Sequence, residues 1–441
     1  MSYEVIAITM FVAMLLMLIT GQRIFAAIGA VATIFALALW GKGASEMPFH
    51  AAFVLMNWYA LLTLPMFVFM GYMFSESGIA DDLYRMFHVW MGPINGGLAI
   101  GTMGLMIAIA AMNGLSVAGM AIGASIALPE MLKRKYDKVM ITGVVQAGSS
   151  LGIMVPPSVV LVLYGMIARQ PVGRLWLGGV LPGLLLGGLM ILYIVIRCAL
   201  QPSLGPALPK EERQQISWGE RFRLLRAGIL PIIIIFSMTG LFLLGYTSLV
   251  ECSAVGAAVT TLAALLKGRL TKQVLLNTLR ETLSVSCMFM WVILAALCFS
   301  AVFDGLGAVH AIELLFHEKW GLGPWGIIMM MQFTFIVMGM FLDDTAMLII
   351  VAPLYVPLVR KLGFDPIWFG VLYTVTCQIA YMTPPFGYNL FLMKAMAPKD
   401  VTLADIYRSI VPFVLVMIVG LIILMLFPQI TLWLPNLYFG K

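Results

Sequence analysis

The pair Pro-Pro occurs only twice in this 441-residue chain, at Pro156-Pro157 and Pro384-Pro385, both inside long apolar segments. The pairs lie 228 positions apart (384 minus 156), and the same separation aligns Pro129 with Pro357. Helix-breaking pairs at equivalent places in two halves of a hydrophobic chain indicate a transporter whose binding site is built from discontinuous helices. The repeat therefore predicts two structurally related halves.

Composition indicates that the chain is surrounded by lipid. It is 62% hydrophobic and 10% charged, whereas soluble domains carry about 25% charged residues. This balance excludes a soluble enzyme, and the length allows roughly a dozen membrane segments of ~20 residues. The net charge of +6 needs no nucleic acid, because basic residues concentrate in cytoplasmic loops of membrane proteins. The five cysteines lack metal-ligand spacing, so neither a metal centre nor a disulfide is expected.

Hydropathy predicts an all-α polytopic membrane protein whose first inverted repeat covers 1–200. The first twenty residues lack a basic region and a cleavage site, so we expect a retained helix. The stretch 95–132 is apolar, about twice as long as one span, and interrupted at Asn113-Gly114, which predicts a re-entrant helical hairpin. A helix at 139–168 is expected to break at 152–157. The other expected elements are scaffold spans at 4–21, 24–40, 53–74 and 177–197 and an amphipathic arm helix at 77–90.

A polar segment at 201–226 is expected to be a cytoplasmic linker, and 227–441 repeats the order of the first half. The expected elements are spans at 227–245, 249–266, 279–303 and 410–434, an arm helix at 307–320, a second hairpin at 324–362 and a broken helix at 366–392. Each half then has an odd number of full crossings, so the repeats must be inverted.

The placement of basic residues predicts the orientation. With the amino terminus outside, 19 of the 26 Lys and Arg residues fall on the cytoplasmic side. The other seven are Lys42, Arg169, Arg174, Lys319, Arg360, Lys361 and Lys441. In this orientation the first hairpin enters from the cytoplasm and the second from outside, so their tips meet near the membrane midplane.

Five runs along the chain form a recognisable series: LPMFVFMGYMFSESGIADDLY, GASIALPEMLKRKYDKVMITG, SSLGIMVPPSVVLVLYG, GMFLDDTAMLIIVAPLYVPLVRKLGFDP and MTPPFGYNLFLMK. In this order and spacing they resemble the large membrane subunit of tripartite ATP-independent periplasmic (TRAP) transporters. The resemblance implies a fold of the ion-transporter superfamily, an elevator mechanism and sodium-driven uptake of organic acids such as C4-dicarboxylates or sialic and sugar acids. It implies no cofactor beyond Na⁺ as coupling ion.

The same resemblance implies a location and partners. The location is the bacterial inner membrane, and the partners are a small four-helix membrane subunit and a soluble periplasmic solute-binding protein. Because this chain starts directly at the large subunit, we expect the small subunit to be a separate polypeptide.

The broken helices predict where ions bind. A break leaves unpaired carbonyls at one helix end and unpaired N–H groups at the next, which suit cations and anions respectively. Carbonyls and hydroxyls of a hairpin tip and the facing break could enclose a dehydrated Na⁺. The sodium candidates of the first half are Asn113, Gly114, Ser116, Ser149, Ser150, Gly152 and Val155. Those of the second half are Gly339, Asp343, Asp344, Thr345, Thr376, Met382 and Thr383.

The substrate carboxylate is expected between the two ion sites, at half-helix N-termini. The candidate residues are Ser116, Ser158, Thr345 and Asn389. Simpler interpretations remain open. Asp343-Asp344 could cap a wet hairpin edge, although an Asp at a helix centre costs about 2.5–3.5 kcal/mol to insert, which favours a function. Ser149 and Ser150 could bond back to their own helix.

The chain departs from the family pattern at two places. The first tip reads Gly114-Leu115-Ser116 where the family has Gly-Ser-Ser, and Thr376 and Ala380 stand where the family tends to have Asn and Gly. These changes leave the ligand set and the ion stoichiometry open.

Two other function classes remain open. A stand-alone sodium- or proton-coupled dicarboxylate or citrate carrier shares the hairpins and needs no binding protein, but such carriers usually show Ser-Asn-Thr at the tips. A non-transporting membrane protein predicts neither proline-broken repeats nor acidic residues at depth. The sequence does not name the solute.

Overall fold

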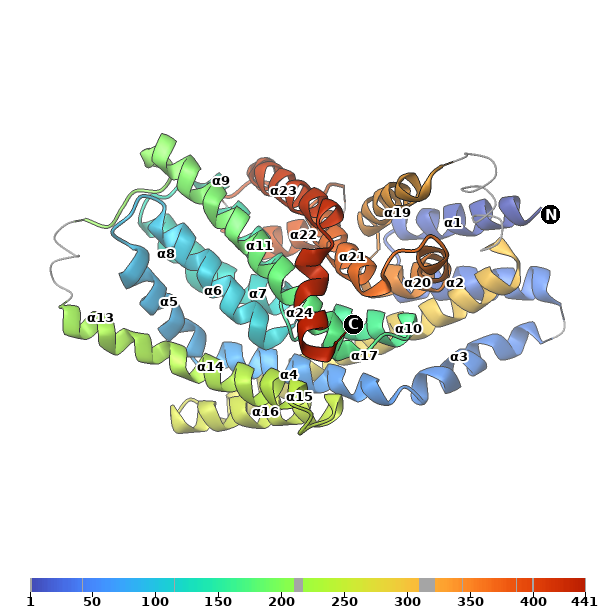
Figure 1. Cartoon of the computed structure of the whole chain (residues 1–441), viewed down its shortest axis with the longest axis horizontal. Coiled ribbons are helices and arrows are strands. Elements are labelled where there is room, and N and C mark those ends of the chain that lie inside the picture. The colour runs from blue at the N-terminus through green and yellow to red at the C-terminus, as the bar shows by residue number, and fades with distance from the viewer. Residues whose placement is uncertain are drawn as a thin grey trace.

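The fold consists of helices joined by short loops in a computed structural model that describes residues 2–440 except 42, 115, 210–216, 309–321, 343, 386 and 399. No strand occurs in this part of the chain. Figure 1 shows two groups of helices: a frame along the lower and right-hand edges, and a second group that lies above it. The helices that form the hairpins and the broken helices belong to the second group.

The first half supplies α1–α4 of the frame. Its helices are α1 (Tyr3–Ile19), α2 (Ile24–Phe35, continued by a π-helical turn Ala36–Trp40), α3 (Met47–Met56) and α4 (Thr63–Glu76). Helices α1 and α2 fall where hydropathy predicts them. The single span predicted at 53–74 is instead interrupted between α3 and α4, around Asn57, whose side-chain amide donates to the Phe53 carbonyl (2.8 Å) at the end of α3. The amphipathic helix α5 (Ile79–Met91) follows, as predicted.

The first hairpin and the first broken helix follow in the order predicted. The helices are α6 (Gly97–Asn113), α7 (Ser116–Ile122, followed by a π-helical turn Gly123–Ala127), α8 (Leu128–Lys133), α9 (Lys138–Ser150), α10 (Val159–Ala168) and α11 (Val172–Leu200). Asp137 starts α9 because its carboxylate accepts the N–H of Met140 (2.9 Å). Between α9 and α10 the chain contains Pro156-Pro157, which lack N–H donors and therefore end the helix.

The second half of the frame begins inside the segment predicted as a linker. Its helices are α13 (Trp218–Leu224), α14 (Ile229–Ile235), α15 (Leu241–Leu243), α16 (Leu249–Leu266) and α17 (Lys272–Gly305). Helix α13 starts early because the Ser217 hydroxyl accepts the N–H of Glu220 (3.2 Å). The Trp90 indole of α5 also donates to the Arg221 carbonyl (3.2 Å). The polar composition of 201–226 predicts only a cytoplasmic linker, so the sequence does not predict α13.

The second hairpin and the second broken helix complete the upper group. The helices are α19 (Pro324–Gly339), α20 (Asp344–Lys361), α21 (Pro366–Tyr381), α22 (Tyr388–Met396), α23 (Leu403–Leu426) and α24 (Gln429–Phe439). The final span predicted at 410–434 is two helices, because Pro428 interrupts the hydrogen-bonding pattern. The predicted arm at 307–320 lies almost entirely outside the described residues.

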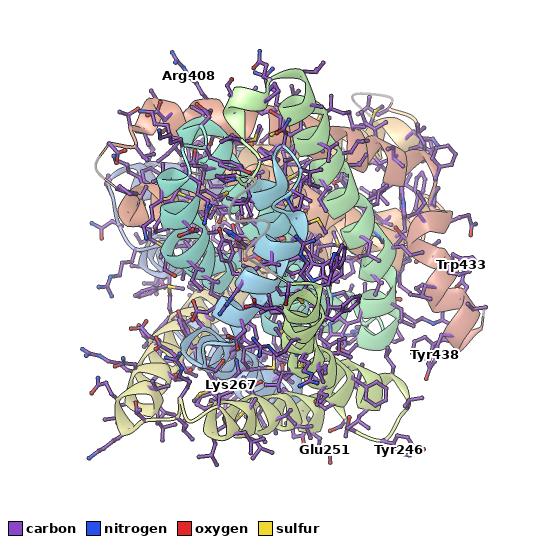
Figure 2. All side chains as sticks on the ribbon, turned by 90° about the vertical axis from the view of Figure 1, so that its left-hand side faces the viewer. Tyr246, Glu251, Lys267, Arg408, Trp433 and Tyr438 are labelled. Carbon is purple, nitrogen blue, oxygen red and sulfur yellow. The ribbon has the colours of Figure 1, made fainter. Side chains whose placement is uncertain are left out.

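Helix lengths separate continuous crossings from interrupted ones. Among the described residues, five helical segments are long and apolar enough to cross a membrane: α11, α13–α15, α16, α17 and α23. The helices of the two hairpins and the two broken helices are shorter, as expected for segments that end inside the protein, except that α20 has 18 residues and so equals α16 in length. Figure 2 shows Lys267 and Tyr246 at opposite ends of α16, with Trp433 and Tyr438 of α24 on the side of Tyr246.

Helix α17 joins the two groups. It packs against α2, α3 and α4 of the frame and against α20 of the upper group. The frame is also tied together at its loops, where the Lys267 ammonium pairs with the Asp82 carboxylate of α5. In the upper group, helices of the first half pack against helices of the second half: α10 contacts α20, and α7 contacts α22.

Candidate functional site

The tip of the first hairpin lies against the first helix break. The N–H of Val159 donates to the Gly114 carbonyl (3.5 Å). Gly114 has a φ of +69°, and a Cβ there would lie 2.4 Å from the Pro157 carbonyl oxygen. Only glycine meets both conditions. The structure thus brings the predicted tip and the Pro156-Pro157 break into contact.

The serines beside this break are buried and bonded to their own helix. Ser149 Oγ donates to the Gln146 carbonyl (2.8 Å) and Ser150 Oγ donates to the Ala147 carbonyl (2.7 Å). A hydroxyl that donates in this way keeps its lone pairs for another donor or a cation. Gly152 and Val155 are buried in the chain that leads to the break. The Asn113 side chain lies outside the described residues.

In the second half, the start of α20 is bonded to α21. Oδ1 of Asp344 accepts the N–H of Thr345 (2.8 Å), and the Asp344 carbonyl accepts the Tyr373 hydroxyl (2.5 Å). Both Asp344 and Thr345 are buried. Asp343 lies outside the described residues. The acidic residue at the second tip is therefore held inside the protein, which differs from the wet edge that the simpler interpretation requires.

The remaining second-half candidates lie on α19 and at the end of α21. The Thr376 hydroxyl lies 2.5 Å from Gln332 Oε1 of α19 and 2.9 Å from the Leu372 carbonyl. The Thr383 hydroxyl donates to the Ile379 carbonyl (2.7 Å). A Cβ at Gly339 would lie 2.5 Å from Ala380 Cβ, so the two helices nearly touch there. Met382 is buried, whereas Pro384 and Pro385 are exposed, unlike the buried Pro156-Pro157.

Two of the four predicted substrate residues, Ser116 and Asn389, are in direct contact, whereas Ser158 and Thr345 make other hydrogen bonds. Ser116 lines the main cavity of the site, described below. Ser158 instead caps α10, where its hydroxyl accepts the N–H of Leu161 (3.2 Å) and donates to the Ile153 carbonyl. Asn389 is fully buried and bonded to other side chains, and Thr345 is buried at the start of α20. The lining of the cavity does not include Ser158, Thr345 or Asn389.

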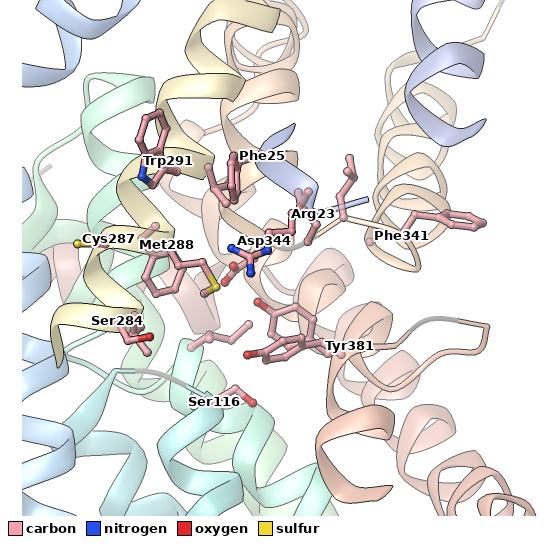
Figure 3. Close-up of a pocket in the computed structure, with 18 of the residues that line it drawn as sticks. Arg23, Phe25, Ser116, Ser284, Cys287, Met288, Trp291, Phe341, Asp344 and Tyr381 are labelled. Atoms are coloured by element: carbon pink, nitrogen blue, oxygen red, sulfur yellow. The ribbon is translucent and has the colours of Figure 1, made fainter. Parts of the chain in front are cut away.

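A cavity of about 770 Å³ separates the frame from the upper group. The upper group contributes residues of both hairpin tips and both breaks, and the frame contributes the start of α2 and the middle of α17. Figure 3 shows Arg23, Asp344 and Tyr381 pointing into the same space, with Ser116 below them and Ser284 on α17. Gly339 also lines the cavity, so the cavity includes candidates of the first and second ion sites.

The lining combines two charged groups and a few polar groups with a majority of apolar ones. It holds the Arg23 guanidinium, the Asp344 carboxyl and the hydroxyls of Ser116, Ser284, Tyr381 and Tyr388. Aromatic and aliphatic side chains of Phe25, Met288, Trp291 and others complete it. A few convergent polar groups in an otherwise apolar concavity are typical of a small-molecule site. A guanidinium offers a fork of N–H donors that matches a carboxylate.

Sequence reasoning missed the cavity residues of the frame. Arg23 stands in the short turn between two apolar segments, where the sequence predicts only a cytoplasmic charge. A cation at a helix N-terminus is unfavourable for the helix dipole, and this unusual position is the signal in the sequence that marks Arg23. Ser284 gave no signal, because it is one of several hydroxyl residues in α17 and nothing in the sequence links it to residues 116 or 344.

Comparison with known proteins gives one family. The profile of "Tripartite ATP-independent periplasmic transporter, DctM component" matches residues 10–430. The chain is 32% identical over 379 residues to the C4-dicarboxylate TRAP transporter large permease protein DctM of Pseudomonas aeruginosa, covering 86% of each chain. It is 27% identical to the ectoine TRAP transporter large permease protein TeaC of Halomonas elongata (86% and 87% covered). It is 25% identical to the sialic acid TRAP transporter large permease protein SiaM of Vibrio cholerae (87% of each).

Solved structures share the fold at low sequence identity. The YdaH transporter of Alcanivorax borkumensis aligns with a TM-score of 0.62 at 12% identity, over 97% of this chain and 99% of that one. MtrF of Neisseria gonorrhoeae aligns with a TM-score of 0.59 at 15% identity, over 88% and 85%. These likenesses concern the fold alone.

Proposed function

Because this chain belongs to the DctM family of TRAP transporters, as the large permease subunit, we propose that it moves an organic acid into the bacterial cytoplasm, driven by an inward sodium gradient. The chain is a multi-pass membrane permease rather than an enzyme. The finer parts of the proposal are the coupling ion, the elevator movement and the site.

The observation that supports this proposal best is the composition of the 770 Å³ cavity. One wall comes from the hairpin tips and helix breaks, and the opposite wall comes from α2 and α17. An elevator needs such a boundary, because the cargo must move with one body and be shielded by the other. We therefore assign α6–α11 and α19–α24 to the moving body, and α1–α4 and α13–α17 to the scaffold. Under this assignment the halves 1–200 and 227–441 are inverted repeats.

The charges of the cavity suit a carboxylate cargo. On the moving body, the hydroxyls of Ser116 and Tyr388 would bind the carboxylate oxygen atoms of the cargo. Arg23 and Ser284 of the scaffold would contact the cargo only in the state in which they line the cavity. Relatives are named for C4-dicarboxylates, ectoine and sialic acid, each of which contains a carboxylate. The solute of this chain is expected to be of that class, with its selection shared with a binding protein.

Two sodium ions are proposed as co-substrates, one for each hairpin tip. The first would lie among the oxygen atoms of Gly114, Ser116, Ser149 and Ser150, whose hydroxyl lone pairs remain available after back-bonding. The second would lie near Asp344, Thr376 and Thr383. Na⁺, like Ca²⁺ and Mg²⁺, is a hard cation that prefers oxygen ligands of this kind.

The opening of the cavity suggests its state in the transport cycle. Gln22 and Arg23 line the cavity and are exposed at the turn between α1 and α2. The bias of basic residues predicts that this turn is cytoplasmic. We therefore assign the structure to an inward-facing state, from which cargo would leave toward the cytoplasm.

The proposal is tested in proteoliposomes with an inward sodium gradient. The probe is a radiolabelled C4-dicarboxylate, with sialic acid and ectoine in parallel. Accumulation is expected only when the small membrane subunit and the solute-loaded periplasmic binding protein are both present, and it should stop when sodium is replaced by potassium. Sodium-driven uptake by this chain alone would contradict the need for partners and support a stand-alone carrier. Uptake that follows a proton gradient without sodium would contradict the coupling ion.

A further inference from the structure

The side chain of Asn389 connects the two halves of the chain. Asn389 belongs to α22, in the second half, but its three hydrogen bonds all reach the first half. Ser116 Oγ of the hairpin tip donates to Asn389 Oδ1 (3.1 Å). Asn389 Nδ2 donates to the Gln146 carbonyl (3.3 Å) and to Ser149 Oγ (3.3 Å) of α9. The amide therefore bridges the tip and the broken helix of the first half.

The chemistry of the partners fixes the orientation of this amide. The Gln146 carbonyl can only accept a hydrogen bond, so the NH₂ group must face it. The Ser149 hydroxyl already donates to the same carbonyl, so its lone pair is free to accept from Asn389. The Ser116 hydroxyl then donates to the amide oxygen. Donors and acceptors match at every contact, and a flipped amide would place two acceptors against each other.

The neighbour of Asn389 faces the cargo. Tyr388 lines the 770 Å³ cavity and is 36% exposed, whereas Asn389, the next residue of the same helical turn, is fully buried. Helix α22 packs against α7 and α9, the helices that hold Ser116 and Ser149. A displacement of α22 by a bound molecule would therefore move the amide that holds the first hairpin tip.

We propose that Asn389 is a positioning residue that couples cargo contact at Tyr388 to the tip of the first hairpin and hence to the first sodium site. This inference rests on the proposed function and replaces the substrate-binding role that the sequence suggests for Asn389. Because the amide oxygen accepts the hydrogen bond from the Ser116 hydroxyl, the lone pairs of Ser116 Oγ point away from Asn389 and remain available to a cation. Its NH₂ group places Ser149 Oγ beside the same space.

The first test measures sodium and cargo dependence of uptake in the three-component proteoliposomes. Asn389→Ala is expected to raise the sodium concentration for half-maximal uptake by about tenfold, as for the loss of a buried hydrogen bond. In wild type the cargo concentration for half-maximal uptake should fall as sodium rises, and in Asn389→Ala this fall should be weaker, because a coupling between two sites acts equally in both directions. Asn277→Ala, which removes an exposed amide of α17, is the matched control and should behave as wild type.

The second test is a double-mutant cycle. Ser116→Ala removes the hydroxyl that Asn389 accepts, so its effect on sodium dependence should overlap with that of Asn389→Ala. The double variant is expected to be little worse than Ser116→Ala alone, because that change already breaks the contact with Asn389 and also removes a proposed sodium ligand. Fully additive effects would contradict a direct coupling. A raised half-maximal cargo concentration with unchanged sodium dependence in Asn389→Ala would show that Asn389 binds cargo, and would overturn the proposal.

A third measurement separates this proposal from the proposed function. Amide hydrogen exchange of the α7 segment Ser116–Ile122 is measured in detergent, without sodium or cargo. Exchange should be about tenfold faster in Asn389→Ala than in wild type and unchanged in Asn277→Ala. If uptake by the wild-type protein did not depend on sodium, the proposed function would be contradicted. The hydrogen-exchange rates would still decide whether Asn389 holds the hairpin tip. Equal exchange rates in the variant and the wild type would overturn the coupling.

Discussion

At the residue scale, Asp344 supplies the carboxylate among the described residues that line the central cavity. It is buried, and its Oδ1 accepts the N–H of the next residue, Thr345. A buried carboxylate in a membrane protein marks an ion or proton pathway more often than a structural contact. The competing interpretation, a solvated cap at a wet edge, does not fit its burial.

Asp344→Asn tests the role of that carboxylate. The variant should insert and fold normally, because a neutral amide is easier to bury than a carboxylate. Uptake should fall, and the sodium concentration for half-maximal uptake should rise by about tenfold or more through loss of a charged ligand. Sodium titration of uptake measures both. Asp304→Asn, an exposed acidic residue of α17, is the control. Unchanged uptake and sodium response in Asp344→Asn would show that the carboxylate takes no part in coupling.

The elements of the site depend on two kinds of signal that differ in how easily they can be predicted. Hairpins and broken helices follow from local chemistry: Gly114 permits the left-handed tip, and Pro156-Pro157 and Pro384-Pro385 end their helices. These elements could be placed from the sequence to within a few residues. Roles that depend on distant partners could not. Ser158 looked like a ligand at a helix N-terminus, but its hydroxyl is used to cap α10.

Distances across the chain explain the other differences between prediction and structure. Arg23 and Ser284 line the cavity with Ser116 and Asp344, but no periodicity relates residues so far apart in the sequence. Helix α13 was hidden by its charges, since its contact with Trp90 of α5 is a tertiary one. The two helices at the carboxyl end had the hydropathy of one span.

The first hairpin provides a prediction at the scale of an element. Gly114→Ala should destabilise the protein by about 1–3 kcal/mol, because the residue has a positive φ and its Cβ would meet the Pro157 carbonyl. The midpoint temperature of unfolding in detergent and the rate of sodium-driven uptake should both decrease. The control is Gly188→Ala on α11, where a Cβ would meet nothing within 4 Å. If Gly114→Ala matched this control, the tip would not depend on its contact with the break.

At the scale of the whole molecule, basic residues predict the orientation and exposed aromatic residues mark a membrane interface. Basic residues predict that the turn after α16 is cytoplasmic. The exposed aromatic residues Tyr246, Trp433 and Tyr438 gather on the opposite side, as expected for a membrane interface (Figure 2). The Tyr438 hydroxyl donates to the Leu243 carbonyl (2.6 Å), which holds α24 beside α15 at this side.

Labelling with an impermeant thiol reagent tests this orientation. In a background without the five native cysteines, a cysteine at Tyr246 should react in intact cells, and a cysteine at Lys272 should react only after the cells are opened. Both positions are exposed, so access to the reagent depends on the side of the membrane alone. Reaction at Lys272 in intact cells would reverse the orientation and with it the assignment of an inward-facing state.

The shared wall of the cavity sets an order of departure. Ser116 and Asp344 face the cavity, whereas Ser149, Ser150 and Thr376 lie behind them in the protein interior. In the proposed mechanism, cargo therefore covers the ions, and the ions cannot exchange with the cytoplasm until the cargo has gone. A cell already rich in the acid would refill the vacated space quickly, trap the ions and delay the return of the empty carrier. Uptake would then be self-limiting, with the accumulated product acting as a brake and no dedicated regulatory domain being required.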